Sequence, residues 1–420
     1  MTTARPHYPP ALADAAVSSL LLTLDPLARA VAPDYWDWSR DAHHALADAL
    51  MEVTDPALGD LVDRVRKDPY DSAACRALAT ELAGSIGADA PRTASVARLA
   101  EEVEVLSRLL VHPGHDDGTP VEPATAQELF RVAAHHRPAH RRPGPVDAAV
   151  VIPFRAGDGD EDRVRNLAAV LAALADQSHP RERYRVVVVE SDVRPRRRDV
   201  IEPACDSYVF APCPGRFNKS WTVNVGVVHG ARPAELVCVL DGDILVDRDF
   251  VARAVNRFRE PGTQAHWPFS DILFLDPVSS HRSVRRRCLD GAARVDPASA
   301  RGVYLRRPPG GCVWLRESLF TRIGGMDERF AGWGGEDQDF VWRMERYGPM
   351  DRHHDPVVHL HHPRAPHREP DGTPFYEDVE QAGFCSWPTD ARFGDLDKYR
   401  GAEERGVLAE EVYAPAHASD

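Results

Sequence analysis

Apolar residues follow two different patterns along this chain. Up to about residue 135 they recur every three or four positions, in stretches broken by prolines such as Pro56 and Pro91. That period predicts amphipathic helices. From residue 148 the pattern changes to short continuous apolar runs at Ala148–Ile152 and Leu236–Leu240, and to four consecutive valines within Arg185–Glu190. Runs of this kind are typical of strands buried on both faces of a sheet.

Strands that alternate with helices indicate an α/β fold. An amphipathic stretch at Arg163–Asp176 separates the first two apolar runs and predicts a crossover helix, so the sheet is expected to be mostly parallel. We therefore predict an all-α N-terminal domain over residues 1–135 and a Pro- and Arg-rich linker over 136–147. An α/β domain over 148–365 and a C-terminal extension over 366–420 complete the predicted order.

Composition and charge narrow the functional classes. The 420 residues carry a net charge of −14, which argues against nucleic-acid binding, because a phosphate backbone needs a basic surface. The seven cysteines are odd in number and contain no Cys-x-x-Cys pair, so we expect neither a disulfide framework nor a zinc knuckle. No apolar stretch reaches the ~18 residues of a transmembrane helix. We expect a cytoplasmic protein, in solution or peripheral to the membrane.

Two carboxylates follow the third apolar run directly, in Asp241-Gly242-Asp243. Ligands of parallel sheets bind at the carboxyl ends of the strands. Hard divalent cations such as Mn²⁺ and Mg²⁺ prefer oxygen ligands and leave positions open for substrate phosphates. The position of this pair after a buried strand therefore predicts a metal and phosphate site.

A second acidic group lies in the segment Gly332-Trp333-Gly334-Gly335-Glu336-Asp337-Gln338-Asp339, just before an apolar helical stretch. Acidic residues in the first turn of a helix are stabilised by its positive end. A simple helix cap needs one such residue, and does not require three glycines and a Trp beside it. A carboxylate held ionised in this way can act as a general base.

Histidines cluster in Val357-Val358-His359-Leu360-His361-His362. Imidazoles at positions i and i+2 of a strand share a face, and Mn²⁺ accepts imidazole ligands. The spacing predicts metal binding and leaves open which of His359, His361 and His362 takes part. The pair His43–His44 has no acidic motif nearby and is interpreted as surface or capping residues.

In order along the chain, these motifs resemble those of GT-A glycosyltransferases, in particular family 2 enzymes and the catalytic domain of the β-1,4-galactosyltransferase family (family 7). The resemblance covers residues 148–365, about half the chain. It implies a Rossmann-like GT-A fold. The matching segments are Val151-Ile-Pro153-Phe154-Arg155, Phe217-Asn218-Lys219 with Asn224-Val-Gly226, Asp241-Gly-Asp243, Gly332–Asp339 and His359–His362.

The resemblance also implies roles for individual residues. Asp337 would be the catalytic base, with Glu336 beside it. Asp243, Asp241, His362 and His359 would hold Mn²⁺ or Mg²⁺. The nucleotide sugar would contact Pro153, Phe154, Arg155, Glu190, Phe217, Asn218, Lys219, Asn224, Asp241, Trp333, Gly334 and Gly335. The family has Arg where this chain has Lys219, one of only three lysines, at positions 67, 219 and 398, so the charge is kept and the guanidinium fork is lost.

The sequence thus predicts a metal-dependent glycosyltransferase. It would move a hexose or N-acetylhexosamine from a nucleotide-diphosphate sugar, a uridine diphosphate sugar on the resemblance, to an acceptor hydroxyl with inversion. The alternatives are a retaining enzyme of the same fold, a sugar nucleotidyltransferase and an inactive binding protein. The acceptor is left open: a glycan, a lipid, a peptide or a small molecule.

Two segments have no part in this chemistry. The N-terminal helices are interpreted as a packing or dimerisation module, which would give a homodimer, with acceptor recognition as the alternative. Arg285-Arg286-Arg287 is interpreted as solvated, with binding of an anionic acceptor or lipid head group as the alternative.

Overall fold

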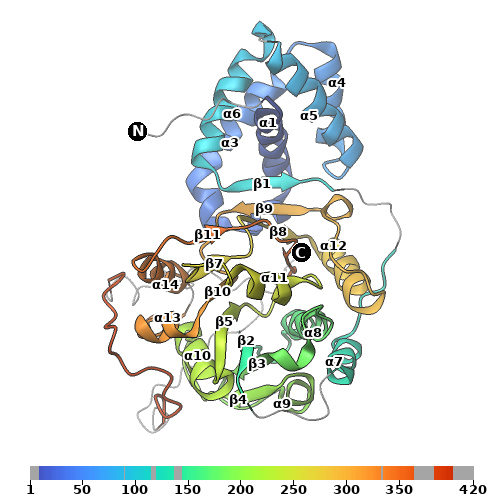
Figure 1. Cartoon of the computed structure of the whole chain (residues 1–420). Coiled ribbons are helices and arrows are strands. Elements are labelled where there is room, and N and C mark those ends of the chain that lie inside the picture. Colours follow the sequence, from blue (N-terminus) through green and yellow to red (C-terminus); the bar gives the residue numbers. More distant parts are fainter. Residues whose placement is uncertain are drawn as a thin grey trace.

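A computed structural model of the chain describes residues 9–88, 90–114, 120–136, 144–332, 334–363 and 383–400. Helices of the N-terminal region stack on one end of an α/β region that contains two sheets (Figure 1). Most of the predicted linker, at residues 137–143, lies outside the described residues, and so does much of the C-terminal extension.

The larger sheet has seven strands, and its centre is parallel. Strand β5 pairs in parallel with β2, β2 with β3 and β3 with β4, whereas β10 pairs antiparallel with β5 and with β7. The prediction of an α/β fold with a mostly parallel sheet is confirmed for this sheet. Its strands, in spatial order, are β11 (Asp351–Arg352), β7 (Ala265–Trp267), β10 (Cys312–Arg316), β5 (Ala234–Leu240), β2 (Val146–Phe154), β3 (Tyr184–Glu190) and β4 (Ser207–Phe210).

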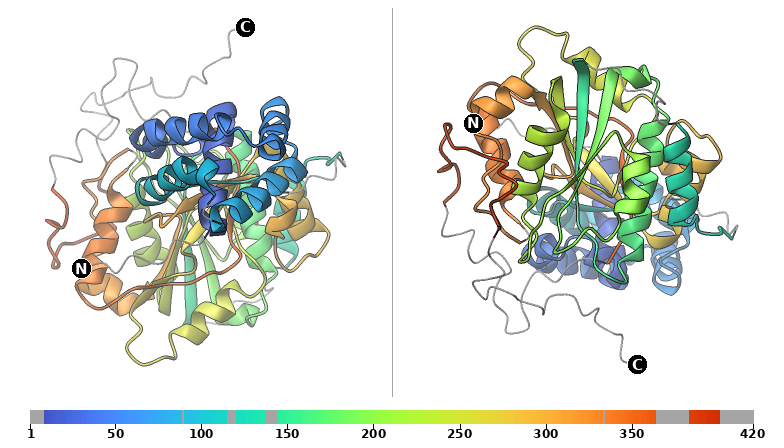
Figure 2. Two further views of the ribbon diagram at one scale, coloured as in Figure 1. Left: turned by 90° about the horizontal axis from the view of Figure 1, so that it is seen from above. Right: turned by 90° about the horizontal axis from the view of Figure 1, so that it is seen from below.

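Both faces of this sheet are covered, which explains the unbroken apolar runs. Ala148, Val150 and Ile152 belong to the core that contains α7 (Ala126–His135) and α8 (Glu161–Ala175). Ala149 and Val151 belong to the core on the opposite face, with α10 (Lys219–Gly226), α13 (Glu317–Arg322) and α14 (Glu336–Glu345). The view from below shows the strands between these two sets of helices (Figure 2, right). Successive side chains of a strand point to opposite faces, so a strand covered on both sides is apolar throughout.

A smaller sheet joins the N-terminal region to the α/β region. Its order is β1 (Leu109–His112), β9 (Gly302–Arg306), β8 (Asp271–Leu275), β12 (Val358–His359) and β6 (Ile244–Leu245). Strand β1 pairs antiparallel with β9, so the N-terminal region is not purely helical as we expected. Four apolar residues after a helix do not reveal a strand by their period alone. The division into separate domains stays a prediction.

The N-terminal helices pack around α1, which is buried along Leu20–Leu22. Pro56 and Pro91, which we interpreted as breaks, open α4 and a short 3₁₀ helix, because Pro fits the first helical position, where no N–H donor is needed. No helix among the described residues is both long and apolar enough to cross a bilayer. The helices are α1 (Pro9–Leu24), α2 (Pro26–Ala30), α3 (Pro33–Met51), α4 (Pro56–Lys67), α5 (Ser72–Gly87) and α6 (Ala94–Leu106).

Buried polar contacts hold the N-terminal helices to the smaller sheet. The Arg301 guanidinium donates to Asp25 Oδ2 at 3.1 Å, and both side chains are at least nine-tenths buried. Arg306 at the end of β9 makes a two-pronged ion pair with Glu104 of α6, at 3.0 and 2.6 Å. The helices and the sheet are therefore fixed to one another by charge as well as by apolar contact.

Two interpretations of polar residues are wrong. His43 lies not on the surface but in the core, with Nδ1 2.8 Å from Ser19 Oγ and Nε2 2.8 Å from Ser107 Oγ, and burial lowers its pKa to about 4. Arg285 and Arg286 are exposed as expected, but Arg287, in the π-helical continuation of α12 (Pro277–Val284), is buried and donates to the Ala173 carbonyl. Burial of these two side chains is possible because each has hydrogen-bond partners. Those partners lie far away in the sequence, so the sequence alone does not reveal them.

Candidate active site and metal centre

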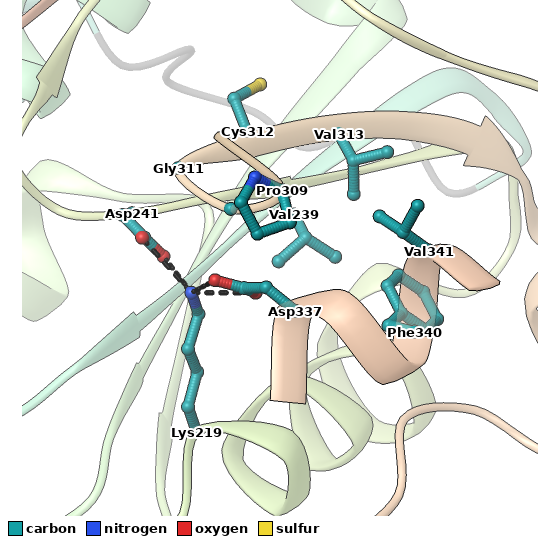
Figure 3. Close-up of a pocket in the computed structure, with 11 residues that line it drawn as sticks. Lys219, Val239, Asp241, Pro309, Gly311, Cys312, Val313, Asp337, Phe340 and Val341 are labelled. Carbon is teal, nitrogen blue, oxygen red and sulfur yellow. Dashed lines mark hydrogen bonds and ion pairs between the residues drawn. The ribbon is translucent and has the colours of Figure 1, made fainter. Parts of the chain in front are cut away.

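An ammonium group and two carboxylates meet at the carboxyl end of β5. Lys219 opens α10, Asp241 follows β5 directly, and Asp337 lies in the first turn of α14. Lys219 Nζ lies 2.9 Å from Asp241 Oδ1 and donates to both oxygens of Asp337 at 3.0 Å. Figure 3 shows the lysine side chain reaching between the two carboxylates at the edge of a pocket. The structure thus brings together three of the residues that the sequence predicted for the site.

The acidic surroundings shift the pKa values of this group. Burial alone would lower the pKa of Lys219, but Asp241, Asp337 and Glu336 outweigh it and hold the pKa well above its usual value. Burial and the nearby carboxylates raise the pKa of Asp241 to about 7, against the opposing effect of Lys219. Burial and Asp337 likewise raise the pKa of Glu336 to about 7. Perturbed carboxyl groups gathered in a pocket are typical of catalytic sites.

Glycines make room for Asp337. A Cβ atom on Gly310 would lie 1.8 Å from Asp337 Oδ2, so a side chain there would displace the Asp337 carboxylate. Gly334 and Gly335 have positive φ values of 106° and 87°, which glycine adopts at no steric cost. Together these glycines set the turn that presents Glu336 and Asp337. Trp333, the remaining predicted residue of this segment, lies outside the described residues.

A second group of polar side chains surrounds Asp243. His362 Nε2 lies 3.0 Å from Asp243 Oδ2, and His359 Nε2 lies 3.5 Å from Asp243 Oδ1. One ligand atom from each of the three residues lies within 4.8 Å of the others. Burial would raise the pKa of Asp243, but the charges that His359 and His362 carry when protonated outweigh it and hold the pKa below its usual range.

The three side chains fit a divalent metal ion. Nδ1 of His359 lies 2.8 Å from the Leu360 carbonyl oxygen, and Nδ1 of His362 lies 2.8 Å from the Pro363 carbonyl oxygen. A carbonyl only accepts, so Nδ1 carries the hydrogen, and in the neutral ring Nε2 keeps its lone pair toward Asp243. Asp243 Oδ1 is buried and has no hydrogen-bond partner among the described residues. One carboxylate and two imidazoles suit Mn²⁺.

The structure selects among the histidines. His361 is not in this group: its N–H donates to Ser280 Oγ, and its carbonyl accepts from Asn166. Strand β12 ends at His359, so the alternation that would pair residues 359 and 361 does not continue. Asp241, which we also expected among the metal ligands, lies against Lys219 instead, and its role as a ligand stays a prediction.

Two asparagines expected to line the nucleotide serve the framework in this structure. Asn218 caps α10 by accepting from the Trp221 N–H at 2.8 Å, and it donates to the Glu328 carbonyl. Asn224 is fully buried and bonds both the N–H and the carbonyl of Met326. Neither side chain is among the residues that line the pocket of Figure 3.

The other predicted nucleotide contacts lie along the ends of β2 and β3. Pro153 and Phe154 end β2, and Glu190 ends β3, buried and bonded to the Tyr208 hydroxyl. Arg155 donates to the Gly215 carbonyl. The Phe217 carbonyl accepts from Gly332 and so ties the start of α10 to the glycine-rich segment. None of these side chains lies in the Lys219 group.

The segment 383–400 was not expected at the site. The Tyr399 hydroxyl lies 3.0 Å from Asn218 Nδ2, next to Lys219, and the Cys385 N–H donates to Asp339 Oδ1 at 2.6 Å, two residues from Asp337. This segment therefore contacts both helices that carry the Lys219–Asp337 pair. Its aromatic residues and its lysine at position 398 could have indicated that this segment packs against the rest of the chain. Their partners are far away in the sequence, so the sequence does not show where it packs.

Comparison with known proteins gives one family match. Residues 305–362, from the end of β9 to His362, match a family model described as the N-terminal domain of galactosyltransferase. No curated protein matches the sequence.

Several solved structures show weak similarity. A mannosyltransferase from Pyrobaculum calidifontis, in complex with GDP-Man and Mn²⁺, is 19% identical, with a TM-score of 0.35 over 56% of this chain and 64% of that one. The catalytic domain of Drosophila β1,4-galactosyltransferase 7, in complex with xylobiose, is 19% identical, with a TM-score of 0.32 over 60% and 83%. S. aureus TarS 1–349 is 16% identical, with a TM-score of 0.33 over 47% and 55%. The chain thus spans less than two thirds of the mannosyltransferase and of the TarS fragment.

The family match covers the glycine-rich acidic segment with Glu336 and Asp337 and also the two histidines beside Asp243. Over these residues the chain is similar to galactosyltransferases.

Proposed function

We propose that the protein transfers a hexose or N-acetylhexosamine from a nucleotide-diphosphate sugar to an acceptor hydroxyl, with a divalent metal ion and with inversion at the anomeric carbon. One observation carries the proposal. The Asp241–Lys219–Asp337 group and the Asp243–His359–His362 group are joined by a single turn at the end of β5. A base, a cation and a metal site are the parts that this reaction needs.

Asp337 is the proposed base. It lies at the positive end of α14 and beside the Lys219 ammonium, and both stabilise the carboxylate. In the proposed step, an acceptor oxygen bonds to the anomeric carbon as its proton passes to Asp337. The bond from that carbon to the diphosphate oxygen breaks, and its electron pair leaves with the diphosphate. Attack opposite the leaving group inverts the anomeric configuration.

Lys219 supports the departing diphosphate in this proposal. Its ammonium is held between Asp241 and Asp337, where negative charge from the donor would arrive, and a fixed cation stabilises such charge as it develops. Glu336, whose Oε2 accepts from the Gly334 N–H, has a raised pKa and is placed to hold a sugar hydroxyl. Asp243, His359 and His362 would hold Mn²⁺ or Mg²⁺. The bound ion would neutralise diphosphate charge as a Lewis acid.

The test is Asp337→Asn, which keeps the side-chain size and removes the base. We expect nucleoside diphosphate release in the presence of acceptor to fall by ~10²–10⁴-fold. Binding of uridine diphosphate with Mn²⁺, measured by calorimetry, should stay near that of the parent. Glu345→Gln, an exposed acid at the other end of α14, is the matched control and should retain full turnover. Full turnover by Asp337→Asn would refute the assignment.

Two measurements on the parent protein test the finer claims. A panel of sugar nucleotides with Mn²⁺, read by thermal shift, identifies the donor; stabilisation by guanosine but not uridine diphosphate sugars would overturn the uridine assignment. The anomeric coupling constant of the product by NMR distinguishes inversion from retention. Release of pyrophosphate in place of nucleoside diphosphate would indicate a nucleotidyltransferase.

A further inference from the structure

The loop from Arg307 to Gly311 connects β9 to β10 and reaches the Asp337 pocket. Pro309, Gly310 and Gly311 line that pocket, and two of them are labelled in Figure 3. Gly310 lies directly against the Asp337 carboxylate. A molecule that brings a hydroxyl to Asp337 therefore has this loop beside it.

Three arginines gather on the outer half of the loop. Arg108, which precedes β1, donates to the Arg307 carbonyl at 3.4 Å, and Arg352 of β11 donates to the Pro308 carbonyl at 3.1 Å. The guanidinium groups of Arg108 and Arg352 thus reach the carbonyls of two consecutive residues, Arg307 and Pro308. Arg352 is fixed from its other side by stacking on Trp267, at 3.8 Å from the ring centre.

The arginines of this cluster differ from their neighbours in the sequence in how their charge is balanced. Arg301, Arg306 and Arg316, which flank the cluster in sequence, each form an ion pair with a carboxylate. For Arg108, Arg307 and Arg352, the described residues provide no ion pair. Asp271, whose charge acts on Arg352, accepts from the Arg307 backbone N–H and from the Ser270 hydroxyl.

Further observations mark this loop as adapted for a ligand. Arg307 has a φ of 49°, in the left-handed region that costs a non-glycine residue energy and is frequent at functional sites. Burial is the largest cause that lowers the pKa of Arg352 to about 10, and repulsion by Arg307 and Arg108 adds to it against the opposing charges of Asp271 and Glu345. An anion between them would relieve that repulsion.

We propose that Arg108, Arg307 and Arg352 bind a phosphate group carried by the acceptor. Guanidinium groups match phosphate oxygens with paired hydrogen bonds, and Arg108 and Arg352 have N–H donors left after their contacts with the loop. At ~3.5 Å per residue, the Cα atoms of Arg307 and Gly310 are at most about 10 Å apart. A short phosphorylated acceptor can span from the base to the arginines over that distance. Its role as acceptor rests on the proposed function.

The proposal gives the N-terminal region a part in recognition. Arg108 comes from the segment between α6 and β1, and its guanidinium also lies 5.3 Å from the Tyr35 ring centre of α3. The pairing of β1 with β9 holds Arg108 beside the loop. The ion pair between Arg306 and Glu104 fixes the same junction.

The experiment measures binding of glucose 6-phosphate and of glucose to the full chain saturated with Mn²⁺ and uridine diphosphate, by calorimetry. We expect the phosphorylated probe to bind at least 10-fold more tightly than glucose. Arg307→Gly, which keeps the backbone conformation, and Arg108→Met should each weaken that binding by roughly 10-fold. Arg66→Met, at an exposed arginine of α4, is the control and should bind as the parent does.

A second arm separates a soluble phosphate from a lipid head group. Sedimentation with phosphatidylglycerol vesicles, lost in Arg307→Gly and absent with phosphatidylcholine, would assign the phosphate to a lipid-linked acceptor. Equal binding of glucose and glucose 6-phosphate, together with no arginine-dependent vesicle binding, would overturn the proposal. Binding of uridine diphosphate with Mn²⁺ is measured in the parent and in every variant. A parent protein that does not bind uridine diphosphate would refute the proposed function and leave the phosphate site intact.

Discussion

The Lys219 ammonium holds together a group of carboxylates that would otherwise repel one another. It lies 2.9 Å from Asp241, 3.0 Å from Asp337 and 3.8 Å from Glu336, and its side chain is only 11% exposed. Lys219→Met keeps the length of the side chain and removes the charge. Three acidic side chains then share a partly buried space without a cation.

The expected loss of folding stability follows from these contacts. Removing one partner of a buried ion pair costs ~3–5 kcal/mol, because the remaining charge stays buried and unpaired. The side chains of Asp241 and Asp337 are 28% and 24% exposed. Water therefore screens their charges and reduces the loss of stability. We therefore expect about 3 kcal/mol for Lys219→Met, at the lower end of that range.

A double-mutant cycle checks whether the contact itself carries this energy. Unfolding in urea at pH 7.5 with a chelator is compared for Lys219→Met, Asp337→Asn and the double variant. We expect the double variant to lose about 2 kcal/mol less than the sum of the single variants, because the second change removes one unpaired carboxylate.

Two controls accompany the cycle. Lys219→Arg keeps the charge and should lose less than Lys219→Met, and Lys67→Met removes an exposed lysine and should have little effect. Additivity of the two single changes within about 0.5 kcal/mol would refute the reasoning.

Other features lead to three further predictions. His362→Ala should weaken Mn²⁺ binding at least ~10-fold by calorimetry, and an unchanged affinity would exclude this metal site. The pKa of His43 is about 4 when folded and 6.5 in its usual state, so the unfolded chain takes up the proton first as the pH falls. Folding stability should drop by about 3 kcal/mol from pH 6.5 to 4, and His43→Gln should remove that part of the pH dependence in urea titrations. Tyr399→Phe removes the hydroxyl beside Asn218 and should lower kcat while the Mn²⁺ affinity is retained; a parental kcat would show that the segment 383–400 does not position Lys219.

Local patterns were sufficient for much of the fold. The runs at Ala148–Ile152 and Leu236–Leu240 lie in β2 and β5, and the amphipathic stretch after the first run forms α8. The position of Asp241 and Asp243 after a buried strand was also readable, because the residues after such a strand lie at one edge of the sheet. Strand β1 was missed, since four residues give no period of their own.

The site was only partly readable. Sequence spacing did not decide which of three histidines bind a metal ion. In the structure β12 ends at His359, and His359 and His362, but not His361, lie beside Asp243. Asn218 and Asn224 were expected at the nucleotide because they follow a family pattern. Their partners at residues 326–328 are about a hundred positions away, and this separation hides the framework contacts that they make.

The sequence by itself determined the kinds of chemistry available to this protein. Periodicity fixed strands and helices, and motifs supplied carboxylates, imidazoles and one lysine among many arginines. Tertiary structure alone decided which of these groups meet. Lys219 contacts acids 22 and 118 positions away, Arg108 reaches a loop 199 positions away, and Arg301 pairs with Asp25 across 276. Such contacts depend on how strands pair and helices pack, because charge and hydrogen bonding act through distance in space and not along the chain.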